Sequence, residues 1–375
     1  MLVQTQIAGH RRIQKLMSNG QYQCEDDIQF YPLSVTLDID RHIDESDDTA
    51  LLERICAAYI KAADRERAVR SGYGATPWWQ KIQQRQLSAV RHALAARDIK
   101  RLQAMYRNFF HDPCSTGLIP RPADKTASHF GGATSDMYRR FILSETRYRI
   151  DYWRSQTEGR FSISALQGPA VGNPFGAMME GTLVPVRAEF QHYCAQRILD
   201  LITSHNAVVV EVGGGFGGMA YYLLRDCPKI TYIDFDVPES LALTAYYLSK
   251  SMPQLNVLLY GEEELTQSAI SGYDIILMPS WELSKLPKSS IDITFSSHAL
   301  SDLISAAQAE YLHGIERATS NWLLYIGAED ACESLRASID ENYPSFGFME
   351  RRPSAWNHLR APKAIEVEFL HRVQK

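Results

Sequence analysis

Paired cysteine motifs are absent from the sequence. Six cysteines lie scattered along the chain, and no two of them form a C-x-x-C pair. Disulfide frameworks and zinc sites show clustered spacings, so we expect isolated thiols in a reducing cytoplasm. Asp, Glu and His residues show no cluster with metal-ligand spacing either. We therefore predict no metal site, although the need for a divalent ion stays open.

Long apolar runs and an excess of basic residues are also missing. No stretch approaches the ~20 apolar residues that cross a bilayer, and the first twenty residues lack the apolar core of a secretory signal. A soluble, cytoplasmic protein without a membrane span is therefore expected. The 39 basic and 44 acidic side chains give a net charge of −5. This charge disfavours nucleic acid as a partner, because phosphate binding needs a concentrated basic surface.

Charge is nevertheless unevenly distributed along the chain. Residues 25–48 carry nine carboxylates and one arginine, whereas residues 79–112 carry seven Lys or Arg and two Asp. These segments are either solvated faces that pair with each other, or the basic segment is a clamp for a phosphorylated or nucleotide-linked substrate.

The 375 residues, 45% of them apolar, suffice for two domains or one large elaborated domain. Apolar residues recur three or four positions apart in segments 49–69, 79–110 and 135–155, which predicts helices there. Segments 111–134 and 166–185 are rich in Pro and Gly and are expected to be irregular loops. We predict a mainly helical N-terminal domain over residues 1–170, which would shape an acceptor pocket.

From residue 207 onward, short β-branched runs alternate with helical segments. Strands are expected at 207–213, 230–236, 273–280, 291–297 and 321–327, and the run 256–261 is undecided. Such alternation builds βαβ units and a parallel sheet. The tail, 345–373, predicts two strands without a helix between them. The fold class expected for residues 171–375 is α/β, a Rossmann-like and mostly parallel sheet with a C-terminal antiparallel hairpin.

The strongest motif is a glycine loop after the first of these strands. It reads EVGGGFGG over residues 211–218, with five glycines in the six positions from Gly213. Glycines permit a tight turn and a close approach of the backbone to a ligand. The spacing fits both the dinucleotide pattern G-x-G-x-x-G and the pattern G-x-G-x-G preceded by a carboxylate.

Glu211 favours the second pattern. A carboxylate at this point would repel a pyrophosphate, whereas S-adenosylmethionine carries an ammonium and a sulfonium and no phosphate. Asp234 and Asp236 follow about twenty residues later and suit ribose hydroxyls with either ligand. We therefore expect S-adenosylmethionine as the cofactor, with NAD(P) as the alternative.

Three segments, EVGGGFGGMAYYLL, IDFDVPESLALTAYYLSK and DITFSSHALSDL, resemble the sugar O-methyltransferases, a branch of the class I S-adenosylmethionine-dependent methyltransferases. YRNFFHDP, VGNPFG, GTLVP and RAEFQHYCAQRI look like that family too, so the likeness spans roughly residues 105–373. It implies that Asp236 binds the ribose diol. It also implies that the methionine part of the cofactor is surrounded by Glu211, Gly213, Gly215 and Gly217, and we count Gly214 with this set.

The chain departs from the family after the fourth predicted strand. The family tends to read N-x-N-S-F-S-E-M there, and this chain reads SSHALSDL over 296–303. His298 would lie at the carboxyl end of the strand, where ligands of open α/β sheets bind. We predict that His298 is a general base and that Asp302 orients its imidazole. Ser301 resembles a helix N-cap, which would instead leave His298 in the preceding turn, capping it or contacting the cofactor.

Five further residues are weaker candidates. Trp281 falls where an adenine ring commonly stacks in this architecture, and core burial is the alternative. Asn173, Phe175 and His129 are loop residues that could close over the acceptor. His313 lies at apolar spacing in a predicted helix and is expected to be a core histidine rather than the base.

These observations predict an S-adenosylmethionine-dependent O-methyltransferase that acts on a sugar hydroxyl. The expected partner is a nucleotide sugar, a polysaccharide or a glycosylated metabolite, and a homo-oligomer is left open. The first alternative is an NAD(P)-dependent oxidoreductase. The second is a non-catalytic subunit that keeps the cofactor fold and serves another enzyme.

Overall fold

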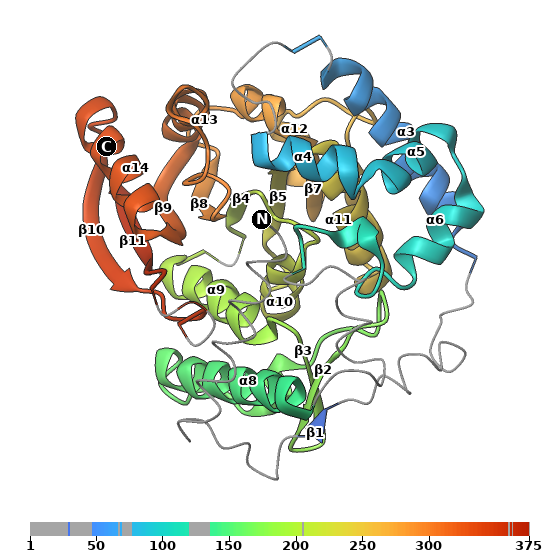
Figure 1. Cartoon of the computed structure of the whole chain (residues 1–375). Coiled ribbons are helices and arrows are strands. Elements are labelled where there is room, and N and C mark those ends of the chain that lie inside the picture. The colour runs from blue at the N-terminus through green and yellow to red at the C-terminus, as the bar shows by residue number, and fades with distance from the viewer. Residues whose placement is uncertain are drawn as a thin grey trace.

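The core of the molecule is an eight-stranded sheet (Figure 1). A computed structural model describes residues 29–30, 47–66, 68–69, 77–119, 136–204, 206–358, 361 and 363–374. In sheet order the strands are β10 (Phe346–Pro353), β11 (Glu366–Val373), β9 (Thr319–Ala328), β8 (Ile291–Ser297), β4 (Val208–Val212), β5 (Thr231–Asp236), β7 (Ile275–Pro279) and β6 (Val257–Leu259). The run left undecided at 256–261 thus supplies β6 at one edge.

The sheet is parallel except for β11, which pairs antiparallel with both β9 and β10. The predicted α/β fold and its C-terminal antiparallel hairpin are therefore confirmed. The sequence of β4 explains why this strand could be predicted. Its nearly continuous apolar run, VVVEV, is typical of a strand buried on both faces, and Val209 and Val210 belong to two different buried clusters.

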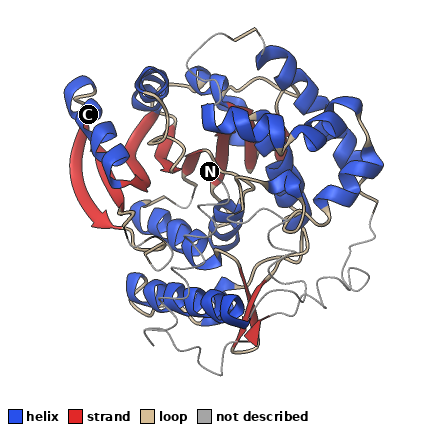
Figure 2. Cartoon of the chain, viewed as in Figure 1, coloured by secondary structure: helices blue, strands red, loops and turns tan. Residues whose placement is uncertain are grey.

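Helices cover both faces of the sheet, as Figure 2 shows for the red strands between blue helices. One face packs against α9 (Ala188–Leu201), α10 (Gly218–Asp226) and α11 (Pro238–Ser251). The opposite face packs against α12 (Gln267–Gly272), α13 (Ser305–Ala318), α14 (Glu329–Asn342) and the 3-10 helix η4 (Ser280–Lys285). This two-layered cover is the arrangement that βαβ units produce.

The N-terminal segment is helical, but its long central helix is interrupted. The structure has α3 (Thr49–Glu66), and it divides the predicted 79–110 helix into α4 (Pro77–Arg85), α5 (Ser88–Ala96) and α6 (Ile99–Tyr106). Arg97 ends α5 in the left-handed conformation, with φ 53°. Asp98 then caps α6, its side chain accepting the N–H of Arg101 at 3.2 Å. This cap makes a new helix start more favourable than continuation.

The N-terminal helices share a buried cluster with one face of the sheet. Asp48, which is 2% exposed, ties them to α11, because its carboxylate binds Arg107 Nε at 2.9 Å and Lys250 Nζ at 2.8 Å. Asp48 and Arg107 come from the acidic and basic segments respectively, so pairing between the segments occurs at this point. The division of the chain near residue 170 stays a prediction.

Segment 166–185, expected to be an irregular loop, contains a hairpin. Strands β2 (Gly176–Met179) and β3 (Thr182–Pro185) pair antiparallel, and β1 (Gln29–Phe30) pairs with β2. Glu180 and Gly181 form the turn with φ values of 50° and 74°. Helix α8 (Asp136–Gln156) lies beside this small sheet (Figure 1). No helix in the described part of the chain is long and apolar enough to cross a membrane.

Candidate functional site

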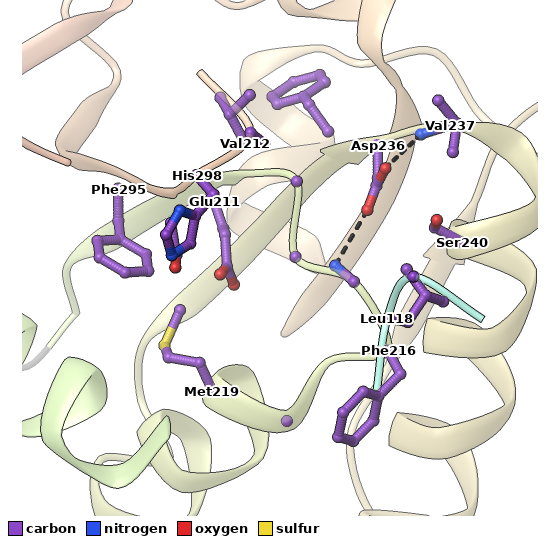
Figure 3. A pocket seen from close by; sticks show the side chains of 18 of the residues that line it. Leu118, Glu211, Val212, Phe216, Met219, Asp236, Val237, Ser240, Phe295 and His298 are labelled. Carbon is purple, nitrogen blue, oxygen red and sulfur yellow. Dashed lines mark hydrogen bonds between the residues drawn. The ribbon is translucent and has the colours of Figure 1, made fainter. Parts of the chain in front are cut away.

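A cavity of about 390 Å³ lies at the carboxyl ends of β4, β5 and β8. Strand β4 is the point where the strand order reverses, with β5 on one side and β8 on the other. Open α/β sheets bind their ligands at such a point, and this volume is in the usual range for small-molecule sites. Figure 3 shows Glu211, Asp236 and His298 among the side chains that line the cavity.

The glycine loop between β4 and α10 lines one side of the cavity. Gly213, Gly215 and Gly217 have φ values of 81°, 67° and 87°, which L side chains rarely adopt. A Cβ at Gly213 would also lie 2.2 Å from the Cβ of Ala299. The loop therefore needs glycine for its conformation and, at Gly213, for lack of space. Gly213, Gly214 and Gly215 line the cavity.

Backbone N–H groups of this loop are already bonded within the protein. The N–H of Gly214 donates to Asp234 Oδ1 and that of Gly215 donates to Asp236 Oδ2, both at 3.0 Å. The N–H of Gly213 donates to the carbonyl of Phe235, at 2.9 Å. A phosphate-binding loop instead presents its N–H groups to the ligand. This loop has turned three of its donors toward β5.

Glu211 and Asp236 are the acidic groups of the cavity. Glu211 is 3% exposed, and burial raises the pKa of its carboxyl group to about 7, although the Tyr232 hydroxyl donates to it at 2.6 Å. Burial also raises the pKa of Asp236 to about 7, against the opposing effect of the N–H groups of Val237 and Gly215. Figure 3 draws both of these hydrogen bonds. The pKa of Asp234 is raised by burial and by its neighbours Asp236 and Glu211.

His298 directly follows β8 and lines the cavity. Its φ of 66° is unusual for a residue other than glycine, and its N–H donates to the carbonyl of Ile326 at 2.7 Å. Burial lowers the pKa of the imidazole. The ring is therefore neutral near pH 7, the form that can accept a proton. A backbone outlier at a ligand cavity is the kind of strain that accompanies function.

Asp302 also lines the cavity, and its N–H donates to the carbonyl of His298 at 2.9 Å. The prediction that Ser301 caps a helix is wrong, because α13 begins at Ser305. The hydroxyl of Ser301 instead donates to the carbonyl of His298, at 3.1 Å. His298 thus heads a hydrogen-bonded turn. The structure adds a second acidic neighbour that sequence reasoning missed, Glu366, whose Oε1 lies 3.8 Å from His298 Nε2.

Side chains that the sequence analysis did not single out also line the cavity. Helix α9 and the residue before it supply Arg187, Phe190 and Gln191, and the N-terminal segment supplies Trp79 and Leu118. Trp79 is fixed by its indole N–H, which donates to Glu239 Oε1 at 2.9 Å. No local signal marks Trp79, because only packing brings α4 to the carboxyl ends of the strands.

Other predicted residues lie away from the cavity. Trp281 belongs to the buried cluster on the opposite face, edge-on to Tyr260, and it does not line the cavity. Asn173 donates to Asn108 Oδ1 at 2.8 Å, and the buried ring of Phe175 packs against Phe110; neither reaches the cavity.

Two predicted histidines remain. His313 is exposed on α13, so the expectation of a core histidine is wrong. Its helix turns it outward, although apolar neighbours flank it in the sequence. His129 lies outside the described residues. Among the residues that the structure describes, no group of three His, Cys, Asp or Glu side chains could hold a metal ion.

Comparisons with known proteins give weak likenesses. No protein-family model matches the chain, and no curated protein matches it in sequence. Similar solved structures include an S-adenosylmethionine-dependent methyltransferase from Aquifex aeolicus (14% identity, 48% of this chain and 89% of that one, TM-score 0.34). A TehB-like S-adenosylmethionine-dependent methyltransferase from Corynebacterium glutamicum is 11% identical over 61% of this chain and 98% of that one, with a TM-score of 0.34. TrmN from Thermus thermophilus is 14% identical over 49% of each chain, also with a TM-score of 0.34. Likenesses this distant do not establish an activity.

Proposed function

We propose that the protein is an S-adenosylmethionine-dependent O-methyltransferase that acts on a sugar hydroxyl. The observation that carries the proposal is the hydrogen bonding of the glycine loop. Asp234 and Asp236 accept the hydrogen bonds of the N–H groups of Gly214 and Gly215, and the carboxyl groups of Asp236 and Glu211 line the cavity. A site with occupied donors and a cluster of carboxyl groups disfavours a pyrophosphate and favours a cationic ligand.

In this proposal the loop and Glu211 hold the methionine part of the cofactor, and Asp236 binds the ribose hydroxyls. The cofactor supplies an electrophilic methyl group when bound. The protein has to orient the acceptor oxygen and remove its proton, and orientation contributes most. His298 is placed to accept that proton, and a general base contributes roughly 10²–10⁴-fold to the rate.

The sugar acceptor is the part of the proposal that rests on the family resemblance. In the segment after β8, His298 and Asp302 stand where the family tends to have Asn and Glu. We expect this difference to affect which acceptor is bound and how its proton is removed. In this proposal the acceptor binds beside His298 and Asp302, which line the cavity. That nucleic acid is not a partner stays a prediction.

Binding measurements test the cofactor first. Isothermal titration calorimetry with S-adenosylmethionine, S-adenosylhomocysteine, NAD and NADP should show binding of the first two compounds and not of the nicotinamides. Binding of NAD or NADP alone would identify an oxidoreductase. Glu211→Gln should weaken S-adenosylmethionine binding, and Glu341→Gln, at an exposed position on α14, serves as the control.

Mass spectrometry then tests the reaction. A panel of sugar nucleotides, glycans and RNA is incubated with the cofactor, and a gain of one methyl group is sought. We expect methylation of a sugar hydroxyl and its loss in His298→Asn, with cofactor binding retained. Cofactor binding without methylation of any compound, together with biological activity unaffected by His298→Asn, would indicate the non-catalytic subunit. Methylated RNA would contradict the sugar acceptor.

A further inference from the structure

A chain of polar contacts leads from His298 away from the cavity to the N-terminal helix α8. His298 Nε2 lies 3.8 Å from Glu366 Oε1, at the start of β11. Both carboxylate oxygens of Glu366 accept from the side-chain amide of Asn357, at 2.9 and 3.1 Å. The Oδ1 of Asn357 in turn accepts from Arg149 Nη2 at 2.9 Å. Arg149 belongs to α8 and is 5% exposed.

The segment between β10 and β11 that carries Asn357 is held firmly by α8. Tyr148 donates its hydroxyl to the carbonyl of Ala355 at 2.9 Å, and Tyr152 donates to the carbonyl of Pro353 at 3.1 Å. Arg149 Nε donates to the carbonyl of Trp356, at 3.1 Å. The Trp356 ring is 2% exposed and packs edge-on to Tyr152, with centroids 4.8 Å apart. Asn357 is therefore a fixed donor, and Glu366 is fixed by it.

We propose that Glu366 is the positioning residue of His298, held in place by Asn357 and, through Arg149, by helix α8. This inference rests on the proposed function, because it gives His298 a partner for the proton transfer. Glu366 accepts from Nε2–H and so leaves Nδ1 unprotonated for the acceptor. The distance of 3.8 Å exceeds a hydrogen bond, and catalytic hydrogen bonds often shorten only in the complex with substrate.

The proton balance of the step is simple. Nδ1 of His298 takes the hydroxyl proton as the acceptor oxygen forms its bond to the methyl carbon, and the carbon–sulfur bond breaks with its electron pair left on sulfur. The resulting imidazolium is stabilised by the carboxylate of Glu366 and later loses its proton to solvent. The charged groups that face the ring are Glu366 from β11, Asp302 from its own turn and Arg187 from the start of α9.

The charges of these groups fix the expected direction of a pH effect. Glu366 and Asp302 raise the pKa of His298, whereas burial and Arg187 lower it. Glu366→Gln removes one favourable charge and should lower the pKa of the imidazole. The acid limb of the kcat profile should then move to lower pH. The value of kcat should fall about 10- to 100-fold, a part of what a general base contributes, and the KM for S-adenosylmethionine should not change.

Matched variants separate positioning from folding. Glu366→Asp keeps the charge and should restore the position of the acid limb with a smaller loss of kcat. Asn357→Ala removes the hydrogen bonds that hold Glu366, so it should also lower kcat. This variant provides the test if Glu366→Gln does not fold. Asp330→Asn removes an exposed carboxylate of α14 and should change neither quantity. A kcat and an acid limb unaltered in both Glu366→Gln and Asn357→Ala would overturn the proposal.

A measurement without substrate separates this proposal from the proposed function. In protein labelled with ¹³C-histidine, an NMR titration gives the pKa of His298 directly. A lower pKa in Glu366→Gln than in the unaltered protein supports the coupling even if no acceptor is ever methylated, in which case the proposed function fails alone. An identical pKa overturns the coupling even if methyl transfer is observed.

Discussion

Gly215 and Asp236 are joined by a hydrogen bond of 3.0 Å from the backbone N–H to Oδ2. This bond links the glycine loop after β4 to the end of β5, and it engages the loop N–H within the protein. The same carboxylate lines the cavity. The carboxylate of Asp236 thus holds the loop in its conformation and also contributes a negative charge to the cavity when it is ionised.

The first prediction concerns pH and the stability of the ligand-free protein. The pKa of Glu211 is raised from 4.5 to about 7, so between these values the folded state binds the proton more tightly than the unfolded state. Stability therefore falls as pH rises from about 4.5 to 7, by about 3 kcal/mol for this group, and is level above pH 7. Urea unfolding at several pH values measures this. The slope should be reduced in Glu211→Gln, and an equal slope would contradict the assignment.

The second prediction concerns pH and the cofactor. A cationic ligand favours the ionised forms of Glu211 and Asp236, so binding should release protons near pH 7. Affinity for S-adenosylmethionine should rise between pH 6 and 8 by up to about 10-fold for each carboxyl group that ionises. Calorimetry in buffers of different ionisation heats counts the protons released. Uptake of protons, or none, would exclude this electrostatic account.

The third prediction compares two glycines in order to separate the cost of an unfavourable φ from the cost of a steric clash. Gly213 and Gly181 have φ values of 81° and 74°, but a Cβ at Gly213 would meet Ala299 at 2.2 Å, and a Cβ at Gly181 would meet nothing within 4 Å. Gly181→Ala should cost about 1 kcal/mol, from the conformation alone. Gly213→Ala should cost about 1–3 kcal/mol more and abolish cofactor binding. Chemical unfolding and calorimetry measure both effects, and equal costs would refute the steric argument.

The fourth prediction decides which tryptophan contacts the cofactor. Trp79 lines the cavity, and Trp281 does not. Trp79→Ala should weaken S-adenosylmethionine binding about 10-fold, because a large apolar wall is removed. Trp79→Phe keeps an aromatic ring, although a smaller one, and loses the hydrogen bond to Glu239, so a smaller loss is expected. Trp281→Phe is the matched control and should bind normally; weakened binding there would restore the adenine-stacking role that its position in the sequence predicts.

Local patterns in the sequence were sufficient for most of the sheet. The apolar run before Glu211 identifies β4, and the alternation after residue 207 identifies a parallel sheet, because strands buried on both faces must be continuously apolar. The break at Asp98 was not predicted, since apolar spacing continues across it. The β2–β3 hairpin was not predicted either. Its short strands on either side of Glu180 and Gly181 show no alternation of apolar and polar residues, and β2 also pairs with the distant strand β1.

By itself, the sequence determined the loop that follows β4, the acidic residues at the strand ends and the position of His298 directly after β8, because each depends on residues that are neighbours along the chain. Only the tertiary structure decided which side chains meet His298 and which close the cavity. Glu366, Asn357 and Trp79 reach the site from distant elements, and Trp281 is turned to the opposite face of the sheet. Such contacts arise from the packing of whole helices and strands, which no short pattern encodes.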